Sequence, residues 1–280
     1  MTQTPPSAAP PTLGPAAWAT CFGGILAREA GRFLQQRGRL IAALVRPLVW
    51  LFIFAAGFRS ILGVSVQDPY QTYILYQVYI APGLVGMILL FAGMQGSLSM
   101  VYDREMGSMR VLLTSPLPRW FLLAAKVVAQ ICVAAVQVYI FLAIAWIWDV
   151  RPPGWGYLAA LPAILLSGVM LSAIGLLLSS FVRQLENFAG VMNFVIFPAF
   201  FASSALYPLW RIRETSHVLY LAAEANPFTH AVELIRFALY QQMAWTSLAV
   251  VAGTAVVAMA AAVWAYDPHR GLAARRGPAA

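Results

Sequence analysis

The chain has 280 residues, of which 61% are apolar and only 10% charged, and its formal net charge is +8 at pH 7. An average soluble domain has about 25% charged residues. The composition therefore excludes an ordinary water-soluble protein and favours one whose apolar surface faces lipid. The two cysteines, Cys21 and Cys132, are too few for a disulfide framework and lack metal-ligand spacing, so both are expected to be ordinary small apolar residues.

The N-terminal part divides into a tail and an amphipathic segment. Residues 1–15 are rich in proline and alanine and carry no charged side chain, which predicts a disordered tail. Over residues 16–39, apolar side chains such as Trp18 and Phe22 fall on one helical face, while Arg28 and Arg32 lie elsewhere. This pattern predicts an amphipathic helix in the membrane interface; the alternative is a surface helix of a soluble domain.

Apolar stretches then recur along the chain, each long enough for the roughly 20 residues that a transmembrane helix needs, and all except the first are free of charged residues. The predicted spans lie within 40–62, 69–102, 127–148, 152–182, 187–210 and 237–266. Arg46 lies near the start of the first, where an arginine can reach the headgroups. The sequence thus predicts an all-α, polytopic membrane protein with six spans in a domain over 40–266, and a cytosolic tail over 267–280.

The basic residues indicate the topology, because cytoplasmic loops of membrane proteins are rich in lysine and arginine. Six spans place both termini on one side, assigned here as the cytosol. The thirteen inner basic residues are Arg28, Arg32, Arg37, Arg39, Arg46, Arg104, Arg110, Arg119, Lys126, Arg183, Arg270, Arg275 and Arg276. The five outer ones are Arg59, Arg151, Arg211, Arg213 and Arg236. The positive charge is therefore explained by topology, and no nucleic-acid partner is expected.

The sequence encodes no recognisable enzyme site. No G-x-x-x-x-G-K-[ST] motif is present, and the only lysine, Lys126, lies in a different context, so the chain lacks a P-loop for ATP. His230 and Glu233 are three residues apart, but two ligands do not make a metal site. The cores of the predicted spans contain no acidic residue of the kind that ion-coupled carriers use. The energy for any transport is therefore expected to come from a partner.

The inner loop over 102–126 is the most informative stretch. Tyr102, Met106, Met109 and Leu113 recur at helical spacing, with charged residues around them, before Pro116 ends the pattern. One interpretation is a charged loop that rests on the lipid headgroups. The other is a short cytosolic helix that presents methionines and charges to a partner's groove, since methionine adapts to irregular apolar surfaces.

This loop resembles that of ABC-2-type exporter permeases, which reads R-E-x-G-[TS], then L-L-x-[TS]-P, and closes with G-K. The matching residues are Arg104, Glu105, Gly107, Ser108, Leu112, Leu113, Ser115, Pro116 and Lys126. Ala125 stands where the family has glycine before the lysine. The segment 226–240 is similar to the family's N-P-[LF]-T segment before the last span. The resemblance covers about residues 17–266.

The resemblance implies a function and several partners. Such permeases pair with a second copy or another permease, bind two separate ABC ATPase subunits, and need no cofactor of their own because the partner uses the ATP. The coupling residues would be Tyr102, Asp103, Arg104, Glu105, Met106, Gly107, Ser108, Met109 and Arg110. The outer segment 208–240, with Asn226 and Pro227, would fold back as short helices that close the outer exit. The expected location is a bacterial inner membrane.

Four tyrosines at the start of the second span have two interpretations. Tyr70, Tyr73, Tyr76 and Tyr79 recur at every third residue. They suit an aromatic belt at the membrane interface, or else a rail on which a sugar or lipid-linked substrate stacks.

The predicted function is that of an exporter permease for a hydrophobic, lipid-like or glycan-linked substrate. Two alternatives stay open: a membrane scaffold that anchors a soluble partner without transport, and a channel or secondary carrier that works alone.

Overall fold

The computed structural model describes residues 14–35, 37–57, 63–64, 68–106, 117–182 and 184–266. The helices among them are α1 (Pro15–Gln35), α2 (Arg37–Gly57), α3 (Tyr76–Glu105), α5 (Arg119–Ala145), α6 (Gly156–Phe181), α7 (Leu185–Phe201), α8 (Leu209–Thr215), α9 (His217–Ala225), α10 (Pro227–Leu239) and α11 (Trp245–Ala265), with a 3-10 turn, η1 (Trp146–Trp148). Two short strands, β1 (Gly63–Val64) and β2 (Ile74–Leu75), pair antiparallel. The all-α class is confirmed, while the two predicted tails lie almost entirely outside the described residues.

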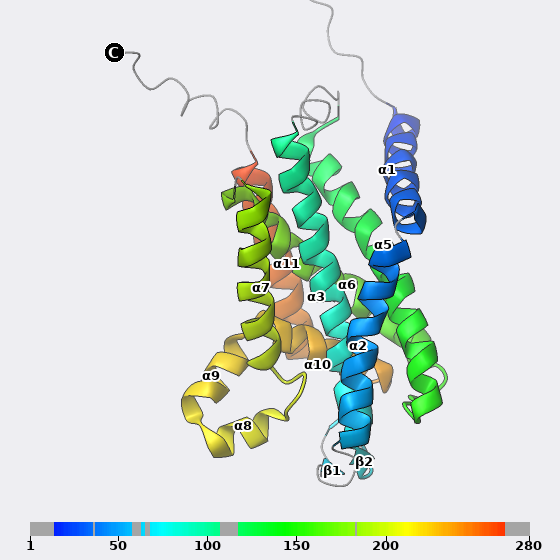
Figure 1. Cartoon of the computed structure of the whole chain (residues 1–280), viewed down its shortest axis with the longest axis vertical. Coiled ribbons are helices and arrows are strands. Elements are labelled where there is room, and N and C mark those ends of the chain that lie inside the picture. Colours follow the sequence, from blue (N-terminus) through cyan, green and yellow to red (C-terminus); the bar gives the residue numbers. More distant parts are fainter. Residues whose placement is uncertain are drawn as a thin grey trace, which may run out of the picture.

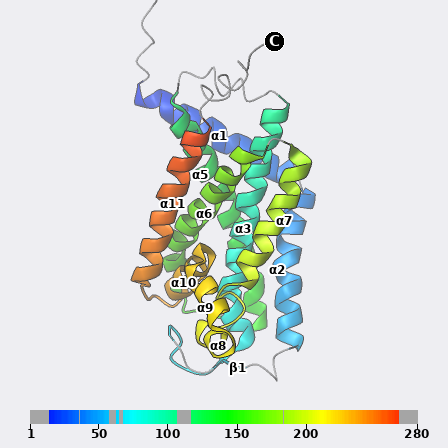
Figure 2. The same cartoon turned by 90° about the vertical axis from the view of Figure 1, so that its left-hand side faces the viewer.

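Six helices run alongside one another as a bundle: α2, α3, α5, α6, α7 and α11 (Figure 1). Helix α1 is inclined to them and crosses one end, as the view from the side shows (Figure 2). We call this the terminal end, because α1 begins there and α11 ends there. The opposite, far end carries the β1–β2 pair and the short helices α8 and α9 (Figure 1).

Four of these helices are long and apolar enough to cross a membrane: Tyr76–Tyr102, Trp120–Trp148, Gly156–Phe181 and Trp245–Ala265. The first and fifth predicted spans correspond to shorter apolar helices, Ile41–Phe54 and Leu185–Phe201. The prediction of six spans is therefore supported for four of them, and the other two remain a prediction. A helix occupies most of the predicted amphipathic segment, although its place in the membrane interface stays a prediction as well.

Close approach of α3 and α6 makes the centre of the bundle. A Cβ atom at Gly93 of α3 would lie 3.0 Å from the backbone nitrogen of Ser172 in α6, and one at Gly175 would lie 2.6 Å from Ser97 Oγ. Lipid gives no hydrophobic drive for helix association, so spanning helices depend on small residues that let backbones meet and van der Waals contacts form. These glycines therefore hold α3 at the core, where Leu84, Met94 and Val101 are fully buried.

Candidate functional site

The predicted coupling residues lie at the terminal end, on the last turn of α3 and just beyond it. Tyr102, Asp103, Arg104 and Glu105 continue α3 without a break, and Met106 follows in a turn. Tyr102, Glu105 and Met106 are exposed, with Met106 at 64%. Gly107, Ser108, Met109 and Arg110 lie outside the described residues. The described part of this segment thus projects side chains away from the bundle.

The residues directly before this exposed turn are anchored in the bundle. Met100 and Val101 are buried, and the buried ammonium of Lys126 in α5 donates a hydrogen bond to Met100 Sδ at 2.9 Å. Beside them, the Ser179 and Tyr266 hydroxyls are 2.7 Å apart and join α6 to the end of α11. Lys126, which occupies the lysine position of the loop motif, therefore secures the base of the exposed turn.

At the far end, the predicted short helices over 208–240 are confirmed as α8, α9 and α10. Asn226 starts α10: its side-chain oxygen accepts a hydrogen bond from the Phe228 backbone N–H at 3.0 Å, and Pro227 takes the first helical position. The Asn226 amide also donates to the carbonyl oxygens of Ala199 and Ala202, both at 2.8 Å. One side chain thus joins the start of α10 to the end of α7.

Helix α10 buries one apolar stripe, formed by Phe228, Ala231, Val232 and Ile235. These positions follow the i, i+3, i+4, i+7 spacing of an amphipathic helix. Unlike a surface helix, α10 also buries a charged residue, Arg236, at only 1% exposure. Arg236 had been expected in an outer loop, but the structure places it inside the helix and against the core, which corrects that expectation.

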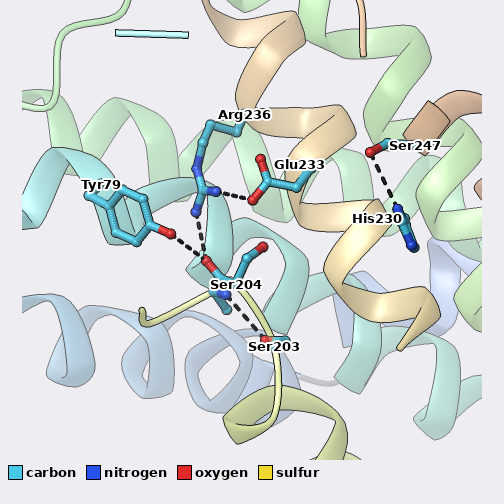
Figure 3. A network of polar contacts seen from close by, with 8 residues as sticks. Tyr79, Ser203, Ser204, His230, Glu233, Arg236 and Ser247 are labelled. Carbon is cyan, nitrogen blue, oxygen red and sulfur yellow. Dashed lines mark hydrogen bonds and ion pairs between the residues drawn. The ribbon is translucent and has the colours of Figure 1, made fainter. Parts of the chain in front are cut away.

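The far-end polar cluster, formed by Tyr79, Ser204, Glu233 and Arg236, surrounds this arginine (Figure 3). Arg236 forms an ion pair with Glu233 and donates from Nη2 to the Ser204 carbonyl oxygen at 2.8 Å. Its guanidinium carbon lies 4.1 Å from the centre of the Tyr79 ring. The Tyr79 hydroxyl donates to the same Ser204 carbonyl at 2.9 Å. The cluster thereby connects α3, the turn after α7, and α10.

Two buried polar atoms of the cluster, the Ser204 hydroxyl and the Nε of Arg236, have no hydrogen-bond partner among the described residues, and outside the cluster the same holds for the hydroxyls of Tyr70 and Thr229. The rings of Tyr70 and Tyr240 lie with their centres 4.8 Å apart. Burial raises the pKa of Tyr70, and it raises the pKa of Tyr240 to about 12. Both phenols therefore stay neutral at physiological pH beside a permanent positive charge.

Burial separates the four tyrosines that were considered as a substrate rail. Tyr70, Tyr76 and Tyr79 are buried within the chain, and only Tyr73 is exposed, at 64%. The Tyr76 hydroxyl donates to the Leu206 carbonyl at 2.8 Å, which ties it to the turn after α7. In this conformation the four rings therefore do not form one continuous exposed surface.

His230 and Glu233 point to different partners. Nε2 of His230 lies 2.9 Å from the Glu224 carbonyl and Nδ1 lies 3.5 Å from Ser247 Oγ, whereas Glu233 turns to Arg236 (Figure 3). The sequence analysis weighs His230 and Glu233 as a metal site, but it does not pair Glu233 with Arg236. The sequence does contain a signal for this ion pair. A glutamate and an arginine lie three residues apart in an otherwise apolar segment, and residues at this spacing share a helical face.

Comparison with known proteins gives consistent matches. The family model described as ABC-2 type transporter matches residues 20–240. A protein of Porphyra purpurea named as the transport permease ycf38 is 27% identical over 76% of this chain and 72% of its own length. A protein of Escherichia coli strain K12 named as the multidrug ABC transporter permease YbhR is 35% identical over 51% of this chain and 39% of its own length.

Proposed function

Because this chain belongs to the ABC-2 type transporter family and is the membrane subunit of a transporter, we propose that it exports its substrate with energy from a separate ATPase subunit. The ATPase would dock on the segment 102–110, whose described part forms the end of α3 and the exposed turn at Met106. The membrane would be a bacterial inner membrane, with both termini in the cytosol. Family membership favours transport over the scaffold alternative, and the named permease relatives favour a multi-subunit transporter over a lone carrier.

The observation that carries the proposal is the length and placement of α3. Its 30 residues extend about 45 Å at 1.5 Å per residue, whereas the hydrocarbon core of a bilayer is about 30 Å thick. One end carries Tyr76 and Tyr79, which bind the far-end turn, and the other end carries the exposed Tyr102 and Glu105. A displacement of the exposed turn by an ATPase would therefore be transmitted along one continuous, buried helix.

The substrate is proposed to be a hydrophobic, lipid-like or glycan-linked compound, and the relative named as a multidrug permease supports an apolar cargo. The cavity between α2, α3 and α5 holds about 80 Å³, while ligand pockets for drug-sized molecules measure about 300–1,000 Å³. A cargo of that size would not fit this cavity. A path between this chain and a second permease, either an identical copy or a paired one, is the expected alternative.

Charge reversal in the exposed turn tests the ATPase contact. In Glu105→Arg the new charge would face the groups of the ATPase that the proposal pairs with a carboxylate, and such a reversal in a docking site costs several kcal/mol. We expect an unchanged amount of protein in the membrane but at least about tenfold less co-purified P-loop ATPase. Met106→Asp is expected to act in the same direction, because it places a charge in an apolar contact.

Glu214→Arg is the matched control, since Glu214 is exposed on α8 at the opposite end of the bundle. The ATPase should co-purify with Glu214→Arg at the wild-type level. Normal co-purification with both Glu105→Arg and Met106→Asp would show that the turn is only a solvated connector.

A further inference from the structure

A cavity with several polar lining residues opens in the bundle, away from both regions described above. We call it the Arg46 pocket. Its polar lining residues are Glu29 of α1, Arg46 of α2, Gln95 and Ser99 of α3, and Gln130 and Gln137 of α5. Apolar side chains such as Ile88, Phe91 and Val133 complete the wall. Polar groups at membrane depth are costly and mark functional sites by default.

Gln137 forms the inner wall of the Arg46 pocket. It is only 6% exposed, and its amide makes no hydrogen bond with any other described residue. Leaving such a group unpaired in an apolar environment costs free energy that a partner in the cavity would recover. The neighbouring Gln130 differs, because its amide donates to the Ala92 carbonyl and so is held in place. Gln137 is therefore available to a ligand.

Arg46 forms the outer wall. Its side chain is exposed, and its guanidinium carbon lies 3.7 Å from the centre of the Phe91 ring, which also lines the pocket. Among the described residues it has no acidic partner. The one carboxylate of the pocket, Glu29, already has a counter-ion in Arg28 at 3.4 Å. The pocket thus joins the molecular surface at Arg46 to a buried amide at Gln137 and has an uncompensated positive charge.

From this arrangement we propose that the Arg46 pocket binds the phosphate headgroup of an amphiphile. A guanidinium matches phosphate oxygens with paired hydrogen bonds, and the Gln137 and Gln95 amides supply further donors. The volume of about 80 Å³ is several times the roughly 10–15 Å³ that a cavity needs to hold one water molecule. In this proposal the phosphate group enters the pocket and the acyl chain remains outside in the lipid. This site needs neither the ATPase nor transport, so its failure would leave the proposed function untouched.

Binding of matched amphiphiles to the detergent-solubilised full chain, followed by native mass spectrometry, tests the proposal. Dioleoyl phosphatidylglycerol is compared with dioleoylglycerol, which has the same chains but no phosphate, and dodecyl phosphate with dodecanol. We expect the phosphate-bearing member of a pair to bind at least about tenfold more tightly, the size of one charge-assisted hydrogen bond. Preference for phosphatidylglycerol identifies a bilayer lipid as the source, and preference for dodecyl phosphate identifies a single-chain cargo.

Two pocket variants and one control decide whether the phosphate-bearing ligand binds in the Arg46 pocket. Arg46→Gln removes the charge and Gln137→Leu removes the amide at nearly constant volume, and each should reduce binding of the phosphate-bearing ligand about tenfold. Arg211→Gln is the matched control, because Arg211 is also exposed and also lies over an aromatic ring, Trp210, but at the far end. Equal binding with and without the phosphate, or wild-type binding by both pocket variants, would overturn the proposal.

Discussion

Arg236 is among the largest side chains that this fold buries completely, and its charge explains the arrangement around it. A buried charge is tolerated only when it is paired and hydrogen-bonded. Glu233 supplies the opposite charge, the Ser204 carbonyl an acceptor, and the Tyr79 ring a cation–π face. Glu233 lies one turn earlier in α10, Ser204 follows α7, and Tyr79 belongs to α3. The arginine therefore fixes α10 against α3 and the end of α7.

Removing one member of this ion pair should therefore cost more than removing both. Glu233→Leu leaves the Arg236 charge buried without its counter-ion, for which we expect a loss of about 3–5 kcal/mol in the free energy of unfolding. The double variant Glu233→Leu/Arg236→Met should recover most of that loss, because no charge remains to be buried. Denaturant unfolding in detergent micelles, followed by tryptophan fluorescence, measures both values.

The exposed pair Arg211 and Glu214 has the same i, i+3 spacing in α8 and provides the control. Both side chains are about 60% exposed, so Arg211→Met/Glu214→Leu and either single change should shift stability by no more than about 1 kcal/mol. If the double variant at Glu233 and Arg236 were no more stable than Glu233→Leu alone, lost packing rather than uncompensated charge would explain the effect.

At the scale of the elements, α3 depends on a backbone contact that no larger residue permits. The Cβ atom of any residue at Gly93 would lie 3.0–3.1 Å from backbone atoms of Leu171 and Ser172 in α6. Backbone atoms in the middle of a packed helix cannot turn aside as the end of a flexible side chain can. A bulky residue at this position must therefore separate α3 from α6 and disturb the helix that joins the two ends of the molecule.

Gly93→Val should accordingly lower stability by about 1–3 kcal/mol through overpacking and reduce ATP-dependent export. Gly253→Val is the matched control, because Gly253 also lies in a spanning helix, α11, and a Cβ atom there would meet nothing within 4 Å. Thermal unfolding in detergent should show a lower midpoint for the first variant and a nearly unchanged one for the second. A similar loss in both would point to helix propensity instead of contact.

The elements themselves were largely predictable, because a bilayer requires long apolar helices whose ends are marked by charges and prolines. Helices exist near the predicted spans 40–62 and 187–210, and the second of them, α7, ends at Phe201, before the apolar stretch does. Which side chains are buried was harder to predict from the sequence. Tyr76 and Tyr79 are compatible with a membrane interface from their spacing alone, and only the approach of the turn after α7 buries them. Contacts between distant segments leave no periodic signal in one sequence.

Across the whole molecule, three of the described arginines at the far end pair with a nearby acidic residue. Arg151 pairs with Asp149 at 3.2 Å, Arg211 pairs with Glu214 at 3.8 Å, and Arg236 pairs with Glu233. Each of these acidic residues offsets the charge of its arginine within three residues of chain. The sequence places thirteen of the eighteen basic residues in segments assigned to the other side. The imbalance favours a cytosolic terminal end, since lysine and arginine near the membrane direct orientation.

This charge distribution predicts the orientation of the chain in the membrane. The end of α3 and the end of α11 lie at the terminal end, while α8 lies at the far end (Figure 1). Reporter fusions near Glu105 and after Ala280 should therefore report the cytosol, and one near Thr215, the last residue of α8, should report the outside.

A fusion near Gly154, between η1 and α6, is the second far-end position and should agree with Thr215. Because α7 is shorter than the four helices that are long enough to cross, the Thr215 result depends on whether α7 crosses the bilayer. If Thr215 reported the cytosol while Gly154 and Ala280 both reported the outside, α7 would not span; if Thr215 and Ala280 reported the same side, α11 would not cross between them. Either result would make six crossings wrong.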